Sequence, residues 1–351
     1  MTLRADSLLA GPRGRRLCLE VLRLAPDDDD AREAARAVSW AAGALDENTG
    51  TIVAIGGAAA SFTEPAVSPA DAAAALSRVE IPVLSDALLS AALAIAVDRA
   101  AYWQPPYGED VLAATDELRE VLEPVAVAVA GAPAIEWWES GVDRDTQAMV
   151  RWENSPASTE SPQELSGRWR SEQVAEEVSF ARRINDVRLS GSWWSTPAFA
   201  LPRSTRVRGT AGPVGLTLVE DSWGWTSARV RPIAAPDGEV IEVDGPESWA
   251  ELCRRHPFPV TASRRNVWGW ATGREGMWVQ PDWAAVAAEA AGVHLSVEGY
   301  LSTAGRVIDL GDLGASTVAG WGPDETFWFS PVEHSAPERE WVRDGDTWTR
   351  A

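Results

Sequence analysis

Apolar residues recur at helical spacing through the first half of the chain. A nearly unbroken apolar run follows Ser85 as far as Val97, which predicts a buried helix with Ser85 as its N-cap. The helix-breaking sequence Pro105-Pro106-Tyr107-Gly108 separates it from a second predicted helix, which we expect Pro124 to kink or restart. That helix is indicated by four apolar residues spaced i, i+3, i+4 and i+7, namely Leu118, Val121, Leu122 and Val125.

Two further segments of this half carry a local signal. Asp27 to Asp30 form an acidic run before an alanine-rich stretch, and negative charge in a first turn favours a helix start there. Residues 51–57 predict a short buried strand or helix end closed by Gly56 and Gly57. The spacing of a dinucleotide-binding loop is not evident around these glycines, so the segment is a weak candidate for phosphate binding.

The second half shows shorter elements separated by turn residues. One predicted helix begins at Pro246, and another is capped by Asp282. Strands are predicted at 216–219, 228–231, 239–243, 293–301, 306–310, 316–321 and 326–329. The predicted fold is α+β: a mainly helical N-terminal domain, then a C-terminal α+β domain with a mixed or antiparallel sheet.

A domain boundary is predicted near the middle of the chain. Residues 154–163 combine two prolines with small polar residues and no apolar anchor, which is typical of a linker. Tryptophan follows the same division, because only four of the 19 tryptophans precede residue 151. We therefore predict a helical domain over 1–153, a linker over 154–163 and a tryptophan-rich α+β domain over 164–351.

Composition and charge narrow the possible partners. The 351 residues are 45% hydrophobic and carry a formal net charge of −21, which disfavours nucleic acid and anionic membrane surfaces and favours a basic protein partner. The competing interpretation is that the acidity only keeps the protein in solution. No window reaches 18 uninterrupted apolar residues, and Met1 to Arg16 lack the features of a signal peptide. We expect a cytoplasmic protein without a membrane partner.

Missing residue types exclude several chemistries. The chain has no lysine, so a Schiff base, a P-loop lysine and a lysine general base are ruled out. The two cysteines, Cys18 and Cys253, cannot build a disulfide framework. The three histidines lack metal-ligand spacing, and neither an EF-hand loop nor a G-x-S-x-G elbow is present. We expect no metal site.

The segment predicted as a strand over 293–301 carries one set of candidate catalytic residues. Alternation would place His294, Ser296, Glu298 and Tyr300 on one polar face, where strand neighbours stand about 6.6 Å apart, too far for a direct His–Ser hydrogen bond. Any catalytic partner of His294 must therefore come from another element, and Glu325 is a candidate.

In chain order, His294, Tyr300 and Glu325 resemble the His-Tyr-Glu set of the diphtheria-toxin-like ADP-ribosyltransferases. The resemblance covers these three residues alone, and the separation of His294 and Tyr300 is short for that family. It implies that histidine orients the ribose of NAD, that tyrosine stacks on nicotinamide and that glutamate stabilises an oxocarbenium charge. The competing interpretation is a polar sheet face exposed to water.

A second candidate region interleaves arginine and tryptophan. Guanidinium groups pair with carboxylate or phosphate and indole offers a stacking face, so this segment predicts a recognition surface. Filling of a core by the tryptophans is the competing interpretation. The candidate binding residues are Arg264, Arg265, Trp268, Trp270, Arg274, Trp278 and Trp283.

Two functional hypotheses follow from these patterns. The leading one is a non-catalytic acidic interaction protein that binds a partner protein, such as a basic one, as an inhibitor or immunity-type protein would. The alternative is an NAD-consuming ADP-ribosyltransferase-like enzyme or glycohydrolase that uses His294, Tyr300 and Glu325, with NAD as its cofactor or substrate.

Overall fold

The computed structural model describes residues 3–47, 66–152, 160–183, 185–186, 188–222 and 224–351. The predicted element at 51–57 lies outside the described residues, as does most of the predicted linker at 154–163.

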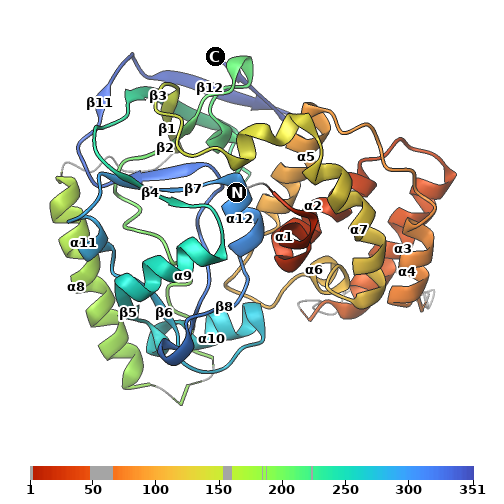
Figure 1. Ribbon diagram of the computed structural model, residues 1–351, viewed down its shortest axis with the longest axis horizontal. Helices are drawn as coiled ribbons and strands as arrows, with labels where there is room; N and C mark the ends of the chain where they lie inside the picture. Colours follow the sequence, from red (N-terminus) through yellow and green to blue (C-terminus); the bar gives the residue numbers. More distant parts are fainter. Residues whose placement is uncertain (1–2, 48–65, 153–159, 184, 187, 223) are drawn as a thin grey trace, which may run out of the picture.

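Helices gathered on one side of the molecule make up the N-terminal part (Figure 1). The central helix α2 packs against α5 and α7, and α1 packs against α7. The helices are α1 (Ala5–Ala10), α2 (Pro12–Arg23), α3 (Asp29–Leu45), α4 (Pro69–Leu76), α5 (Asp86–Asp98), α6 (Gly108–Leu112), α7 (Asp116–Ala130) and the 3-10 helix η1 (Pro133–Glu139).

Local capping signals explain where these helices begin. Ser85 accepts a hydrogen bond from the backbone N–H of Leu88 at 3.2 Å, which confirms the predicted N-cap of α5. The acidic run also starts a helix as predicted, because Asp28 caps α3 through the N–H of Ala31 at 2.8 Å. Pro124 lies inside α7, and the helix does not restart there. The predicted restart is therefore wrong, and the predicted kink stays a prediction.

A mixed nine-stranded sheet forms the C-terminal part. Its order is β13-β12-β3-β1-β2-β10-β7-β4, with β11 also paired to β3. Only β4 and β7 pair in parallel among the pairings within this sheet in the described chain. The strands are β1 (Gln147–Trp152), β2 (Arg203–Arg206), β3 (Ser227–Ala234), β4 (Val240–Val243), β7 (Gly292–Leu295), β10 (Glu325–Trp328), β11 (Glu333–His334), β12 (Arg339–Asp344) and β13 (Thr347–Arg350).

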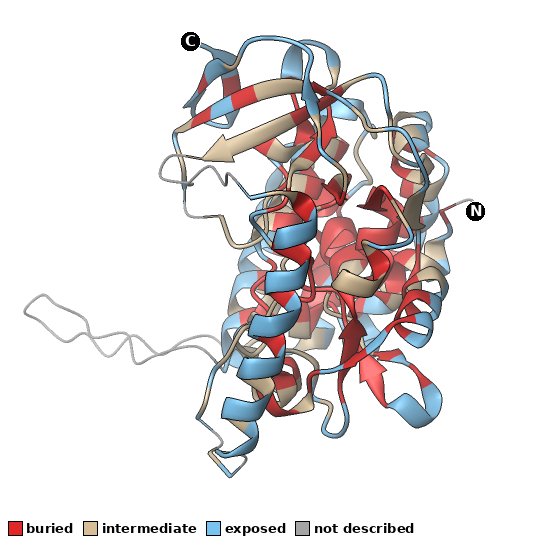
Figure 2. Ribbon diagram, turned by 90° about the vertical axis from the view of Figure 1, so that its left-hand side faces the viewer, coloured by how far each residue is buried: buried red, intermediate tan, exposed pale blue. Residues whose placement is uncertain are grey.

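Helices and two small ladders surround this sheet. The ladders pair β5 with β6 and β8 with β9, and α8 turns a largely exposed face outward (Figure 2). The remaining elements are α8 (Pro162–Ala181), η2 (Gly209–Ala211), η3 (Val214–Leu216), α9 (Pro246–Arg255), β5 (Pro257–Pro259), α10 (Thr261–Thr272), β6 (Val279–Pro281), α11 (Trp283–Val286), α12 (Val297–Thr303), β8 (Ile308–Asp309), η4 (Gly311–Leu313) and β9 (Ala315–Ser316).

The two parts of the chain are joined by packing as well as by sequence. Strand β1 belongs to the first half in sequence, yet it lies between β2 and β3 in the sheet. Helix α12 of the second half packs on α1 and α2, and one continuous cluster of buried apolar residues spans both halves. The division into domains over 1–153 and 164–351 stays a prediction.

The architecture confirms the predicted α+β class and corrects several elements. Strands at 228–231, 239–243 and 326–329 and the helices after Pro246 and Asp282 are present, and the bounds of these strands differ by at most three residues from the prediction. The predicted strand at 216–219 is wrong, because η3 and an irregular segment occupy that region. The predicted strands at 306–310 and 316–321 shrink to the two-residue strands β8 and β9.

The predicted strand over 293–301 is wrong beyond Leu295. Ser296 caps a helix there by accepting a hydrogen bond from the N–H of Gly299 at 3.0 Å. Gly299 lets this helix approach β4, because a Cβ at that position would overlap the carbonyl oxygen of Val243. The alternating pattern therefore belongs to a strand of four residues followed by a buried helix, α12.

The described chain contains no helix long and apolar enough to cross a membrane. Both Cys18 and Cys253 are free and buried, and burial raises the pKa of each thiol to about 12. Neither is therefore activated as a nucleophile.

Candidate functional site

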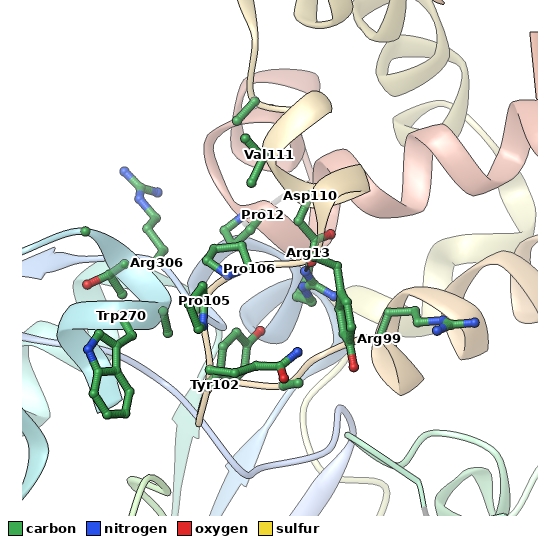
Figure 3. Close-up of a pocket in the computed structure, with 18 of the residues that line it drawn as sticks. Pro12, Arg13, Arg99, Tyr102, Pro105, Pro106, Asp110, Val111, Trp270 and Arg306 are labelled. Carbon is green, nitrogen blue, oxygen red and sulfur yellow. Dashed lines mark hydrogen bonds and ion pairs between the residues drawn. The ribbon is translucent and has the colours of Figure 1, made fainter. Parts of the chain in front are cut away.

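A pocket of about 510 Å³ opens where the helical part meets the C-terminal part. Figure 3 shows Trp270 and Arg306 on one side of it and Arg13, Tyr102 and Asp110 on the other. We call it the arginine pocket, because among the described residues four arginines and two acidic residues line it: Arg13, Arg15, Arg99 and Arg306 against Glu47 and Asp110. Its volume lies in the range of small-molecule sites.

One arginine of the pocket is neutralised inside the protein. The guanidinium of Arg13 is fully buried, forms an ion pair with Asp110 and donates a hydrogen bond to the carbonyl of Ala96 at 2.8 Å. Asp110 also lies 3.3 Å from the guanidinium of Arg16. Burial alone would lower the pKa of Arg13, but the charge of Asp110 keeps it above its usual value. The ion pair of Arg13 and Asp110 therefore lines the pocket with two charges that neutralise each other.

The other three arginines have no such neutralisation. Within the described residues, none of Arg15, Arg99 and Arg306 forms an ion pair with a carboxylate. Arg99 is exposed, whereas Arg15 and Arg306 are partly buried. The positive charge of these three side chains is therefore not balanced by an ion pair in the described part of the chain.

Arg15 is the most constrained of the three. One of its terminal nitrogens donates to the carbonyls of Leu9 and Ala10 at 2.8 and 3.1 Å, while its Nε is buried without a partner. Burial, followed by the nearby charge of Arg119, lowers the pKa of Arg15 to about 10. The cation still holds its proton at neutral pH, in surroundings that disfavour positive charge.

The apolar part of the pocket comes from rings. Tyr102 and Trp270 line it together with Pro105 and Pro106 from the segment that breaks the chain after α5. Gly305 fixes the approach of the two walls: it has φ +70°, and a Cβ there would overlap Cε1 of Tyr102 and lie 2.9 Å from its Cζ. A side chain at 305 would therefore push the walls apart.

His294 lies elsewhere, in a buried charge network of the sheet. Its Nδ1 lies 2.6 Å from Glu242 on β4, and its Nε2 lies 3.4 Å from Asp324, which also pairs with Arg206 at 2.5 Å. Burial alone would lower the pKa of His294, but hydrogen bonds and charge from Asp324 and Glu242 raise it to about 9. The imidazolium ties β4, β7 and the start of β10 together.

The other two residues of the His-Tyr-Glu set are not assembled with it. Glu325 pairs across the sheet with Leu295, whereas His294 pairs with Thr326, so alternation turns the side chains of His294 and Glu325 to opposite faces. Glu325 forms an ion pair with Arg203 at 3.2 Å. Tyr300 is buried on α12, and burial followed by the charge of Glu220 raises its pKa well above the usual value.

Most of the arginine–tryptophan segment is core. Trp268, Trp278 and Trp283 are buried, and the indoles of the first and last donate to the carbonyls of Trp193 and Ser195 at 2.6 and 2.9 Å. Trp283 also meets the ring of Trp321 edge-on at 5.8 Å. These three side chains therefore do not form a surface.

The rest of that segment divides between helix contacts and the pocket. Arg264 is buried and binds Glu176 and Gln173 of α8 at 3.0 and 2.8 Å. Arg265 and Arg274 donate to the backbone carbonyls of Ala262 and Met277 at 2.5 and 3.0 Å. Trp270 alone of the seven lines the arginine pocket, with 37% of its surface exposed.

Sequence reasoning missed the arginines of this pocket. Arg15, Arg99 and Arg306 come from three distant segments and share no motif or spacing. No group of three or more histidine, cysteine or acidic side chains in the described residues is arranged to hold a metal ion. No family model, no curated protein and no solved structure matches this chain.

Proposed function

We propose that the protein binds a small anionic ligand in the arginine pocket, through phosphate or carboxylate groups of a molecule that also carries a planar ring. The observation that carries this proposal is the set of three arginines, Arg15, Arg99 and Arg306, that line one pocket without a carboxylate partner in the described structure. Guanidinium groups pair with both kinds of anion, and Tyr102 and Trp270 offer rings for stacking.

In a chain with this excess of acidic residues, three arginines without a carboxylate partner are unexpected. Acidic residues outnumber arginines by 52 to 31, so an arginine can readily find a carboxylate in this protein. Buried Arg16, Arg206 and Arg264 each do so. Arginines that line one pocket without a carboxylate partner among the described residues favour an external anion.

This proposal modifies both hypotheses made from the sequence. A basic protein partner stays a prediction drawn from the net charge of −21, and its contact surface would have to lie away from the arginine pocket. NAD belongs to the proposed ligand class, because it carries a pyrophosphate and two planar rings. Binding of NAD here would not involve His294 or Glu325, since neither lines this pocket.

Titration calorimetry at low ionic strength tests the proposal with pyrophosphate, ATP, NAD and citrate as probes. We expect saturable binding of at least one probe, and loss of about tenfold or more in affinity for Arg306→Gln and for Arg99→Gln. Arg339→Gln is the matched control, because Arg339 is an exposed arginine on β12 outside the pocket. Absence of binding by every probe, or unchanged affinity in the Arg99→Gln, Arg306→Gln double variant, contradicts the proposal.

A further inference from the structure

A second pocket, of about 230 Å³, lies within the C-terminal part, against β1, β2 and β10. We call it the carboxylate pocket, after Glu220 and Glu325, which both line it. Four aromatic side chains form much of the rest: Trp152, Trp193, Phe199 and Trp225. The rings of Trp152 and Trp225 stack at 4.7 Å with an interplanar angle of 13°.

Glu220 is the proton-holding member of the acidic pair. One carboxyl oxygen accepts a hydrogen bond from the N–H of Gly320 at 2.6 Å, while Oε1 is buried without a hydrogen-bond partner. Burial raises the pKa of Glu220 to about 8, against the lowering effects of Tyr300, the Gly320 N–H and Arg13, and the charge of Glu325 raises it further. Near neutral pH Glu220 is therefore largely a neutral acid.

Glu325 is the member that pairs with a cation. Its carboxylate lies 3.2 Å from the guanidinium of Arg203, which itself lies over the rings of Phe199 and Phe327 at 5.3 and 5.7 Å. Burial raises the pKa of Glu325, and Arg203 counteracts that rise. Glu325 is thus the member of the pair that has a direct cationic partner.

From this pair we infer that the carboxylate pocket hydrolyses a glycosidic bond, with Glu220 as the general acid and Glu325 as the carboxylate that faces the reacting carbon. Two carboxyl groups at one pocket, one paired with a cation and the other buried without a cationic partner among the described residues, are an arrangement that suits glycosidic cleavage.

The proposed step balances without any further reactant than water. Glu220 gives its proton to the leaving oxygen as the bond between that oxygen and the anomeric carbon breaks, and the bonding electrons stay with the oxygen. Glu325 stabilises the positive charge at the anomeric carbon and takes a proton from the water whose oxygen bonds there. Proton exchange with solvent then restores both carboxyl groups.

The size and lining of the pocket indicate the part of the substrate that it holds. Its volume is below the range of sites for drug-sized ligands, which fits a single sugar ring with the rest of the substrate outside. Aromatic faces pack against the C–H groups of a sugar ring, and Ser204 and Thr205 offer hydroxyl groups in the same pocket. No residue lines both pockets, so this inference does not rest on the proposed function.

The test is release of 4-nitrophenol from 4-nitrophenyl α- and β-glycosides of glucose, galactose, mannose, xylose and N-acetylglucosamine at pH 6 to 7. We expect turnover of at least one substrate, and a fall of roughly 10²- to 10⁴-fold in kcat for Glu220→Gln and for Glu325→Gln. Glu340→Gln is the control, because Glu340 is an exposed acid on β12. No turnover of any of these glycosides overturns the inference.

A second substrate separates the two roles and excludes a merely structural effect. A 2,4-dinitrophenyl glycoside of the sugar accepted has a leaving group that needs no protonation, so Glu220→Gln should recover most of its activity on it. Glu325→Gln should stay impaired on both substrates. Equal impairment of Glu220→Gln on the two leaving groups, with a melting temperature no lower than that of the parent, contradicts the assignment of Glu220 as the acid.

Discussion

The two pockets differ in how the protein treats their charges. In the arginine pocket, three cations lack carboxylate partners among the described residues, so an outside anion can complete the site. In the carboxylate pocket, Glu325 pairs with Arg203, and burial keeps the other acid, Glu220, largely protonated. The first arrangement suits binding and the second suits proton transfer, which shows that pairing of charges, more than their number, distinguishes the two sites.

A row of buried groups runs between the two pockets. Tyr102 lines the arginine pocket, Glu220 lines the carboxylate pocket, and the charges of both groups act on Tyr300 of α12. Arg13 lowers the pKa of all three. Because these groups influence one another, the pockets are best compared with variants that change a single side chain at a time.

The largest expected effect comes from closing the space beside Tyr102. Gly305→Ala should lower the free energy of unfolding by about 2–4 kcal/mol, because φ is +70° and the new Cβ would overlap the ring. Gly345→Ala is the matched control, since Gly345 has φ +58° and nothing within 4 Å of an added Cβ. Urea denaturation measures both, and equal losses would show that the ring contact is unimportant.

The pH dependence of the unfolding free energy tests whether Glu220 of the carboxylate pocket is protonated in the folded protein. Unfolded Glu220 ionises near pH 4.5 while the folded protein holds its proton to about pH 8, so the unfolding free energy falls as pH rises through this window. Glu298, with a pKa raised to about 7, and His294, at about 9, act in the same direction. We expect Glu220→Gln to be more stable than the parent at pH 7, by roughly 3 kcal/mol.

The same measurement contains its own control. The fall in stability that remains in Glu220→Gln between pH 8 and 9 should come from His294, whose stabilising effect is complete below pH 6.5 and is lost as pH rises through about 9. Identical slopes in the parent and in Glu220→Gln between pH 5 and 8 would contradict a protonated Glu220.

How far the sequence could predict this structure depends on the range of the interactions. The caps of α3 and α5 were predictable because Asp28 and Ser85 bond to backbone groups three residues away. The prediction of a strand over 293–301 was wrong because we followed the alternating pattern and not the helix cap at Ser296. The local sequence also does not reveal that Gly299 approaches Val243.

The candidate sites were less predictable for the same reason. Glu325 was selected from sequence and does line a pocket, but its partner acid there, Glu220, is 105 positions away and carries no motif. Burial of Trp268, Trp278 and Trp283 depends on packing around α8, α10 and the sheet. Arg15, Arg99 and Arg306 become a site only when α2, the end of α5 and the segment after α12 meet.

Removal of the constrained cation should separate stability from binding in the arginine pocket. Arg15→Gln should leave the ligand-free protein as stable as the parent or stabilise it by up to about 1 kcal/mol, because a partly buried unpaired charge is lost. Affinity for the anion that binds the parent should fall about tenfold. Thermal melts with and without that ligand measure both, and lower stability without ligand would mean that the bonds to Leu9 and Ala10 outweigh the charge.

The smallest effect concerns the link between the pockets. Tyr300 lowers the pKa of Glu220, so Tyr300→Phe should raise that pKa and move the falling limb of the stability profile to higher pH, by less than about one pH unit. Glu220→Gln should abolish this displacement, because the titrating group is gone. If the displacement persists in the Glu220→Gln, Tyr300→Phe double variant, the group that titrates is His294 or Glu298 and not Glu220. Tyr300 would then act on the arginine pocket through Tyr102 alone.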